Sequence, residues 1–230
     1  GLDDAADEIT EYYLKPRGGR ADKGKTRHWE NFYASNVGIL EPSPFALTVS
    51  SIISNMDSIL EVGCGNGRDS IFFVSQGHQV VALDTSEAAI ELCRQTHKEI
   101  PVAFLANSLS DFRSTHPTLF DCVYSRFVLH AMTLEEEAEF LTAAGQVLKT
   151  GGKIFLECRS ILDSLARKGE IISSTERVFG HYRRFIILED LLDRVRQAGF
   201  GNLVIEESKG LAVFGDEDPT IIRLIGEKLP

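Results

Sequence analysis

Short apolar runs alternate with amphipathic stretches along the chain from Asp57 onward. The apolar runs have the length of buried strands, and the amphipathic stretches have the spacing of roughly three to four residues that helices require. The pattern predicts strands at 58–62, 79–83, 102–105, 120–124 and 153–158, and helices at 69–76, 86–97, 108–112 and 134–149. Strands that alternate with helices in this way form a parallel sheet with helices on both faces.

The last part of the chain departs from this alternation. After a helix at 188–198, apolar runs at 203–207 and 211–214 are separated only by Ser208-Lys209-Gly210. This connection is too short for a crossover, so the two runs are predicted to form an antiparallel hairpin at the end of the sheet. A final helix is predicted at 219–228.

The first part of the chain, residues 1–56, has a helical pattern that is interrupted by a basic loop at 15–28. Proline and paired glycines break the helix there, and we expect this loop to be disordered without a ligand. Trp29, Phe32 and Tyr33 form an aromatic stripe, which either closes over a ligand or packs on the sheet. We therefore expect an N-terminal helical lid at 1–56 and a ligand-binding domain at 57–230.

Composition and charge narrow the class of protein. The 230 residues carry a net charge of −10, so a nucleic-acid surface, which needs a basic excess, is not expected. No apolar run approaches the roughly 20 residues of a membrane span, and no signal segment is visible. The four cysteines are dispersed without a CxxC pair, which favours a reduced, cytoplasmic setting without bound metal. The chain is also compatible with being one domain of a larger multidomain protein.

A glycine-rich segment, Glu61–Gly67, follows the first predicted strand and opens a helix. Such a turn lets the backbone approach a cofactor, although it can also serve only to pack a strand on a helix. The dinucleotide pattern GxGxxG requires a third glycine where this chain has Arg68. Asp84, about 20 residues later at the tip of the second strand, is placed to accept hydrogen bonds from ribose hydroxyls. The segment therefore predicts a cofactor with an adenosine part that is not a nicotinamide dinucleotide.

The pattern Glu-x-Gly-x-Gly-x-Gly resembles motif I of class I, Rossmann-like S-adenosylmethionine-dependent methyltransferases, and the resemblance in strand order covers residues 57–214. It implies a Rossmann-like, seven-stranded, mostly parallel sheet with a terminal antiparallel hairpin. It implies S-adenosyl-L-methionine as cofactor and S-adenosyl-L-homocysteine as product. The cofactor-binding residues that it implies are Glu61, Gly63, Cys64, Gly65, Asn66, Gly67, Asp84, Thr85, Asn107, Ser108, Ser125 and Tyr33.

The fourth predicted strand ends in a segment, Tyr124–His130, that lies between methyl donor and acceptor in the resembling family. Arg126 and His130 are spaced so that a helical turn would place them on one face. His130 either takes a proton from the acceptor or has a structural role, and both alternatives stand. With Arg159 at the end of the fifth strand, these residues are the catalytic candidates.

A second group of cationic and aromatic residues lies at 179–185. The candidates for acceptor binding are His181, Tyr182, Arg183 and Arg184. They are predicted to fold over the carboxyl edge of the sheet and to converge with Arg126 and Arg159 on an anionic group of the acceptor. The alternative is a set of surface charges paired with neighbouring glutamates.

Taken together, these patterns predict O-methylation of a small anionic acceptor, such as a sugar or a compound with a phosphate or carboxylate, by in-line transfer. The chain resembles bacterial small-molecule methyltransferases, including those associated with surface polysaccharides, and no metal is required. An RNA or protein methyltransferase is the first alternative, although Ser125-Arg126-Phe127-Val128 occupies the slot of the usual amino-methylating motif. A non-catalytic module that binds the same cofactor is the second.

Overall fold

The computed structural model describes residues 41–179 and 181–230, the side chain of His181 excepted. The basic loop at 15–28 and the aromatic stripe with Tyr33, together with most of the predicted lid, lie outside the described residues.

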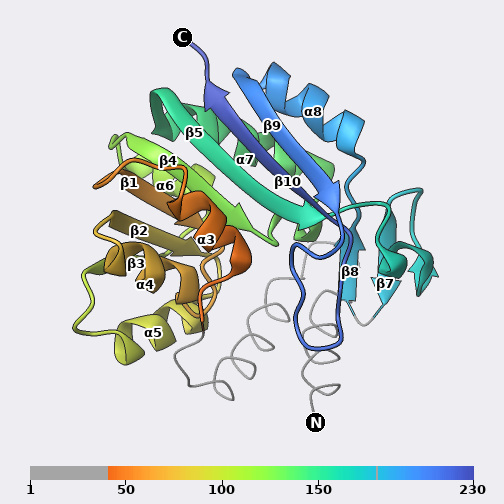
Figure 1. Cartoon of the computed structure of the whole chain (residues 1–230), viewed down its shortest axis with the longest axis horizontal. Coiled ribbons are helices and arrows are strands. Elements are labelled where there is room, and N and C mark those ends of the chain that lie inside the picture. Colours follow the sequence, from red (N-terminus) through yellow and green to blue (C-terminus); the bar gives the residue numbers. More distant parts are fainter. Residues whose placement is uncertain (1–40, 180) are drawn as a thin grey trace.

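One mixed sheet organises the molecule, with the strand order β3-β2-β1-β4-β5-β10-β9 (Figure 1). The strands β1 (Ser58–Val62), β2 (Gln79–Asp84), β3 (Val102–Ala106), β4 (Phe120–Arg126) and β5 (Leu148–Arg159) run parallel. β10 (Ile221–Lys228) is antiparallel to both β5 and β9 (Phe200–Ser208). The predicted seven-stranded, mostly parallel sheet with a terminal hairpin is therefore confirmed.

The α-helices described are α3 (Pro44–Ser50), α4 (Arg68–Ser75), α5 (Glu87–Thr96), α6 (Leu109–Thr115), α7 (Leu134–Val147) and α8 (Leu188–Gln197). They cover both faces of the sheet, because side chains alternate between the faces along each buried strand. In β1, Ile59 packs in the cluster that contains Phe45 of α3 and Phe73 of α4. Its neighbour Leu60 packs on the other side, in the cluster of α6, α7 and α8.

Local capping explains where the helices begin. The Ser43 hydroxyl accepts the backbone N–H of Ala46, and Pro44 is the first helical residue of α3. The Ser86 hydroxyl accepts the backbone N–H of Ala89 and caps the start of α5. Thr133 and Glu136 form a reciprocal capping box at the start of α7.

The predicted boundary between α7 and β5 was wrong. α7 ends at Val147 and β5 begins at Leu148, so the strand starts inside the segment that was predicted as the end of the helix. Leu148 is fully buried and pairs with Phe120, whereas Lys153 already pairs with Cys122. The residues between them form an irregularity in β5, which Gly151 accommodates with a positive φ of 76°.

The predicted end of the chain was also wrong. Residues 211–214 lie in a loop, and the segment predicted as a final helix is β10, the central strand between β5 and β9. Its apolar run starts with Ile221 and Ile222, and both are fully buried. A short β-branched run favours a buried strand over a helix.

A second, three-stranded antiparallel sheet occupies part of the stretch predicted as irregular. It has the order β6-β7-β8 and consists of β6 (Glu170–Ile171), β7 (Glu176–Phe179) and β8 (His181–Arg184). The 3₁₀ helices η1 (Leu129–Ala131) and η2 (Ser164–Arg167) lie beside it, contacting β8 and β7 respectively. No helix in the described part of the chain is long and apolar enough to cross a membrane.

Candidate active site

The loop Gly63–Gly67 connects β1 to α4 in a shape that requires glycine. The backbone N–H groups of Gly63 and Cys64 both donate to the carbonyl of Leu83, at 2.8 and 2.9 Å, which ties the loop to β2. Gly63 has a φ of +80°, and a Cβ atom there would lie 2.2 Å from a methyl group of Val128. The loop therefore approaches the segment that follows β4 more closely than any side chain would allow.

Asp84 lies at the end of β2, beside this loop. Its two carboxylate oxygens accept the backbone N–H groups of Gly65, at 2.9 Å, and of Ser86, at 2.8 Å. Burial raises the pKa of Asp84, and these backbone hydrogen bonds oppose the rise. Each oxygen accepts one of these bonds and keeps capacity for another, so the carboxylate can still accept a ribose hydroxyl.

Glu61 lies beneath the loop and is only 4% exposed. Its carboxyl group accepts a hydrogen bond from the Ser70 hydroxyl of α4. Burial and then the charge of Asp69 raise the pKa of Glu61 from 4.5 to about 8. Glu61 thus holds the start of α4 against β1 from below.

The other predicted cofactor residues differ in what their side chains contact. Asn107 is half-buried after β3, and its amide has no hydrogen-bond partner among the described residues. The hydroxyl of Ser108 accepts the N–H of Asp111 and so caps α6. Ser125 is fully buried and its hydroxyl donates to the carbonyl of Val62 at 2.9 Å.

Three further predicted residues lie around the loop. The Asn66 side chain accepts the backbone N–H of Arg68 at 3.3 Å, and Thr85 is exposed. Cys64 is buried beside Cys93 of α5, whose thiol donates to the carbonyl of Gly65 at 3.2 Å. Cys64 is therefore a packed side chain under the loop.

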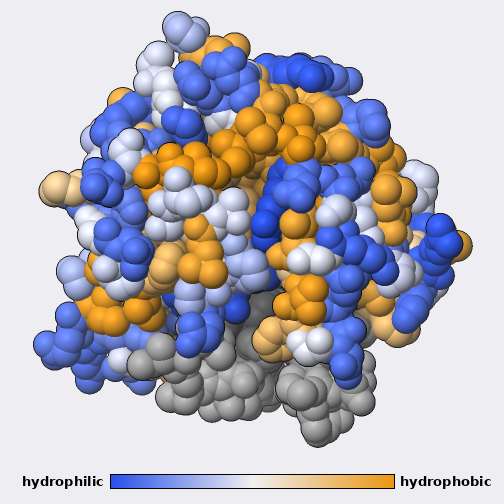
Figure 2. Space-filling model, viewed as in Figure 1, coloured by the Kyte–Doolittle hydropathy of each residue, from blue (hydrophilic) through white to orange (hydrophobic). Residues whose placement is uncertain are grey.

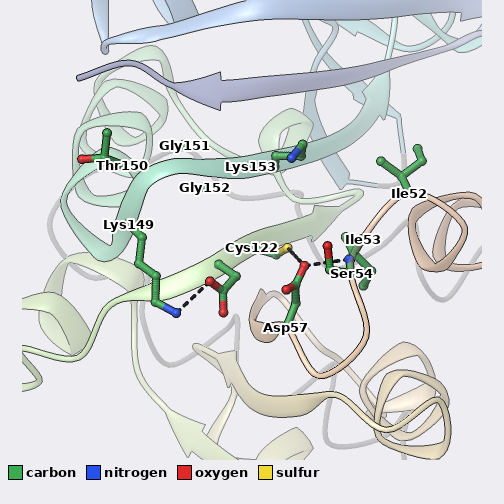
Figure 3. Close-up of a pocket in the computed structure, with 11 residues that line it drawn as sticks. Ile52, Ile53, Ser54, Asp57, Cys122, Lys149, Thr150, Gly151, Gly152 and Lys153 are labelled. Atoms are coloured by element: carbon green, nitrogen blue, oxygen red, sulfur yellow. Dashed lines mark hydrogen bonds and ion pairs between the residues drawn. The ribbon is translucent and has the colours of Figure 1, made fainter.

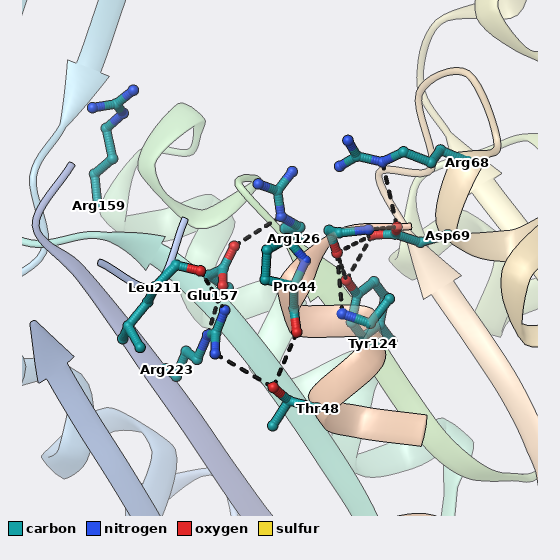
Figure 4. A network of polar contacts seen from close by, with 12 residues as sticks. Pro44, Thr48, Arg68, Asp69, Tyr124, Arg126, Glu157, Arg159, Leu211 and Arg223 are labelled. Atoms are coloured by element: carbon teal, nitrogen blue, oxygen red, sulfur yellow. Dashed lines mark hydrogen bonds and ion pairs between the residues drawn. The ribbon is translucent and has the colours of Figure 1, made fainter. Parts of the chain in front are cut away.

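A buried network around Asp69 was missed in the sequence analysis. Its carboxylate accepts the N–H and hydroxyl of Ser43, at 2.8 and 2.7 Å, and the hydroxyl of Tyr124 at 2.8 Å (Figure 4). These bonds fix α3 and α4 to β4 at the mouth of the site. The only signal in the sequence was an acid in the first turn of the helix that follows the glycines.

A second buried carboxylate, Glu157 of β5, binds two arginines. One oxygen accepts Nε of Arg126 and the other accepts Nε of Arg223, both at 2.8 Å (Figure 4). The terminal nitrogens of Arg126 have no hydrogen-bond partner among the described residues. In Figure 4 the guanidinium groups of Arg126 and Arg68 point toward one another, away from Glu157. Glu157 therefore fixes Arg126 by one nitrogen and leaves its outer edge available.

The remaining predicted arginines are bound to partners. Arg159 pairs with Asp163 at 3.1 Å and with Glu217 at 3.0 Å. Arg184 is buried and pairs with Glu137, and its Nε donates to the carbonyl of Met132.

Arg183 and Tyr182 of β8 also form hydrogen bonds within the protein. Arg183 is buried and donates to the carbonyl of Phe179 at 2.9 Å. The Tyr182 hydroxyl donates to Glu176 across the small sheet. Of His181, the structure describes only the backbone, which pairs with Phe179.

His130 lies in η1 among these arginines. Burial lowers the pKa of its imidazole well below 6.5, and the charges of Arg159, Arg183, Arg184 and Arg126 lower it further. The ring packs edge-on against Phe127 at 5.4 Å, and its Nδ1 accepts the backbone N–H of Arg159 at 3.5 Å. His130 is therefore neutral near pH 7, and four of the predicted arginines lie near enough for their charges to act on its ring.

Phe127 is the other residue that the sequence analysis did not single out. It has a φ of 58°, an unusual value for a residue other than glycine and one that is often found at functional sites. The guanidinium carbon of Arg126 lies 4.2 Å from the centre of its ring, and that of Arg159 lies at 5.8 Å. Phe127 thus stands between the end of the cofactor loop and the arginines.

The surface supports this location for ligand binding. A hollow with hydrophilic residues at its floor lies between α3 and the β9–β10 loop (Figure 2). A separate pocket lies at the opposite edge of the sheet, between Ile53, Asp57, Cys122 and Lys153 (Figure 3). That pocket is at the amino ends of β1 and β4, whereas ligands of open α/β sheets bind at the carboxyl ends. Among the described residues, no group of three or more metal-ligating side chains is close enough to hold an ion.

Comparison with known proteins agrees with this arrangement. Residues 59–152 match the family model of a methyltransferase domain. A ubiquinone biosynthesis O-methyltransferase from Xanthomonas euvesicatoria is 28% identical over 160 residues, which are 66% of this chain and 65% of that protein. A cypemycin N-terminal methyltransferase from Streptomyces is 24% identical over 163 residues, 70% of this chain and 64% of that protein. The aligned part is thus just under two thirds of these relatives.

Solved structures show the same fold. A TehB-like SAM-dependent methyltransferase from Corynebacterium glutamicum superposes with a TM-score of 0.61 at 19% identity, covering 90% of this chain and 97% of that one. A 1,6-didemethyltoxoflavin-N1-methyltransferase from Burkholderia thailandensis, solved with S-adenosylhomocysteine, gives 0.66 at 16% identity over 94% and 93%. The glycine loop and Asp84 fit that cofactor, since the loop gives its backbone close access and the carboxylate retains acceptor capacity. Residues 59–152 are thus a methyltransferase domain, and the sheet that contains them has the Rossmann-like fold of class I S-adenosylmethionine-dependent methyltransferases.

Proposed function

We propose that this methyltransferase transfers the methyl group to an oxygen of a small anionic acceptor, a sugar or a compound that carries a phosphate or carboxylate. The observation that carries the proposal is Arg126 at the end of β4, whose Nε is fixed by Glu157 and whose terminal nitrogens have no partner within residues 41–179 and 181–230. A guanidinium held in this way can bind an anion through two parallel hydrogen bonds. The chain as a whole has a net charge of −10, whereas several arginines lie near one histidine in this region.

In this proposal the cofactor lies along the carboxyl ends of β1 to β3. The loop Gly63–Gly67 faces its methionine part, Asp84 accepts the ribose hydroxyls and Asn107 binds the adenine. Glu61 and Ser108 do not contact the cofactor in this proposal, because their side chains form hydrogen bonds within the protein. Glu61 supports the glycine loop, and Ser108 supports the start of α6. Tyr33 and the lid at 1–56 keep their predicted role of closing over the cofactor.

Transfer from a sulfonium requires the nucleophile, the methyl carbon and the sulfur to lie in line. An acceptor oxygen that is already ionised needs no base, and then Arg126 orients it. A neutral imidazole surrounded by positive charges is a weak base, so we assign His130 to positioning Arg159 and Phe127. We assign Arg159, which is bound by two carboxylates, to the support of the site.

An amine acceptor, on a small molecule or a peptide terminus, is the second candidate. It is favoured by two of the similar proteins described above, the cypemycin N-terminal methyltransferase and the 1,6-didemethyltoxoflavin-N1-methyltransferase. The two candidates differ in the atom that is methylated, which mass spectrometry of the product identifies. A surface-polysaccharide acceptor remains a special case of the sugar prediction.

The test has a cofactor arm and an acceptor arm. Calorimetry should show S-adenosylmethionine binding to the wild type and at least about tenfold weaker binding to Asp84→Asn, because a hydrogen-bonded carboxylate is lost at the ribose. The wild type should release S-adenosylhomocysteine with sugar phosphates or carboxylated phenols, and Arg126→Gln should raise the KM of that acceptor about tenfold while the cofactor KM stays unchanged.

Arg196→Gln is the matched control, because Arg196 is exposed on α8 and its one ion pair within the described ranges is with Asp193. Failure of the wild type to bind the cofactor would contradict the assignment of the cofactor residues. If the wild type methylates only neutral amines, the anionic acceptor is contradicted and the amine acceptor is supported. The same holds if Arg126→Gln and the wild type have equal KM values for the anionic acceptor.

A further inference from the structure

The loop at 209–220, between β9 and β10, extends beyond the carboxyl edge of β5 (Figure 1). Two contacts tie this loop to the arginines of the site. Nη2 of Arg223 donates to the carbonyl of Leu211 at 2.7 Å, and Nη2 of Arg159 pairs with Glu217 at 3.0 Å. The loop therefore has a defined position next to the residues that we assign to the acceptor.

The tip of this loop is a tight turn that sets the direction of one phenylalanine. The N–H of Phe214 donates to the carbonyl of Glu217, and the N–H of Glu217 donates to the carbonyl of Phe214, both at 3.0 Å. Residues paired in this way have their side chains on the same face of the turn. Because Glu217 contacts Arg159, the ring of Phe214 is on the side of the turn that faces the arginine.

The ring of Phe214 is 69% exposed. An aromatic side chain of this exposure on an anchored turn is apolar surface that a ligand can cover with a gain in free energy. Arg159 and Arg126 both lie beside the ring of Phe127, at 5.8 and 4.2 Å. A molecule whose anion binds Arg126 can therefore extend past Arg159 to Phe214.

We propose that Phe214 determines specificity by binding the apolar part of the acceptor, so that the acceptor is amphipathic. Its anionic group, a carboxylate or a phosphate, binds Arg126, and its aromatic or alkyl body packs on Phe214. A plain sugar phosphate has no such body and is disfavoured. This inference rests on the proposed function, and it narrows the acceptor from anions in general to anions with an apolar body.

The test uses two pairs of anions that differ in an apolar ring: inorganic phosphate with phenyl phosphate, and acetate with benzoate. Their affinities are measured by calorimetry on the full chain saturated with S-adenosylhomocysteine. In the wild type the ring-bearing member of each pair should bind about tenfold more tightly, as expected for a ring that covers an aromatic anchor. In Phe214→Ala this ratio should fall to about one, while phosphate and acetate bind as in the wild type.

Met56→Ala is the matched control, because Met56 is 71% exposed and precedes β1 at the opposite edge of the sheet. It should keep the wild-type ratio, and the affinity for S-adenosylhomocysteine should be unchanged in both variants. A ratio in Phe214→Ala equal to that of the wild type overturns the inference, as does a wild type that binds both members of each pair equally.

A third variant separates this inference from the proposed function. Arg126→Gln should weaken all four anions by a similar factor and keep the ratio within each pair. If Arg126→Gln binds the anions as the wild type does, the anionic acceptor site is wrong even where Phe214→Ala removes the preference for a ring. A wild type that binds none of the four anions overturns both.

Discussion

The two halves of the candidate site are held together by different interactions. In the cofactor half, the glycine loop is fixed by backbone groups: Gly63 and Cys64 donate to Leu83, and Gly65 donates to Asp84. In the acceptor half, long side chains from distant elements hold each other, as Glu157 does with Arg126 and Arg223. Glu137 of α7 repeats that arrangement with Arg184 and Arg194.

The difference has a physical consequence for how each half responds to change. A backbone-built loop depends on which φ values and how much space the residues allow, so a single methyl group disrupts it. An ion-pair network depends on charges that have been removed from water, so loss of one partner leaves the others uncompensated. The following predictions test this contrast, from the largest expected effect to the smallest.

Gly63→Ala should have the largest effect, because Gly63 lies where the halves meet. The new methyl group would lie 2.2 Å from a methyl of Val128, on a backbone with a φ of +80°. Strain and overpacking together should lower the free energy of unfolding by about 4 kcal/mol. Urea unfolding and calorimetry with S-adenosylhomocysteine measure the losses in stability and cofactor affinity.

Gly77→Ala is the control for the strain alone, since Gly77 also has a positive φ, +93°, but nothing lies within 4 Å of the added atom. It should cost about 1 kcal/mol. Equal losses in the two variants would show that space around the glycine loop is not the limiting factor.

Glu157→Gln should destabilise the protein through the acceptor half. The variant leaves Arg126 and Arg223 without the buried carboxylate that both bind, which should cost about 3 kcal/mol in urea unfolding. Asp193→Asn, which breaks an exposed pair with Arg196, should cost less than about 0.5 kcal/mol. The contrast between the halves fails if Glu157→Gln weakens cofactor binding as much as it weakens acceptor binding.

Glu61→Gln should make the protein more resistant to alkaline pH. The pKa of Glu61 is raised in the folded state from 4.5 to about 8, so its favourable contribution is present below pH 4.5 and is lost as the pH rises through 8. Glutamine does not ionise, so the variant should have a higher free energy of unfolding than the wild type at pH 9 and a smaller advantage at pH 5. Unfolding at pH 5 and pH 9 measures this, with the exposed Glu139→Gln of α7 as control.

His130→Gln should have the smallest effect on stability, in the acid range. The pKa of His130 is lowered in the folded state, so its contribution is present above pH 6.5 and is lost as the pH falls below that value. Between pH 7 and pH 5 the wild type should lose about 1 kcal/mol more than the variant. A fall in kcat of more than about a hundredfold in the variant would instead make His130 the general base.

The cofactor half was predicted closely because its determinants are local. The strand at 58–62 lies where the sequence analysis put it, and the strand predicted at 79–83 differs from β2 by one residue. Periodicity, caps and glycines act over a few residues, so the sequence alone contains them. The roles of the residues within that half, Asp84 and Asn107 included, remain predictions until a cofactor complex is measured.

The errors lie where the determinants are distant. The hairpin was predicted to turn at Ser208-Lys209-Gly210, whereas the chain continues in a loop to Thr220 before β10 begins. The network of Asp69 with Ser43 and Tyr124 joins residues from three elements and has no periodic signal. Arg184 was predicted to face the acceptor, and the structure shows it bound to Glu137, which no spacing rule relates to it.

The sequence by itself determined the parallel strands of the sheet and the glycine loop, because apolar periodicity and the conformational freedom of glycine are properties of short segments. The tertiary structure decided which arginine keeps terminal nitrogens without a partner in the part of the chain that the structure describes. Arg126, Arg159 and Arg184 are equivalent as residue types, and they differ only in the carboxylates that the fold brings to them. Ion pairing depends on distances between elements far apart in the chain, and only the folded arrangement sets those distances.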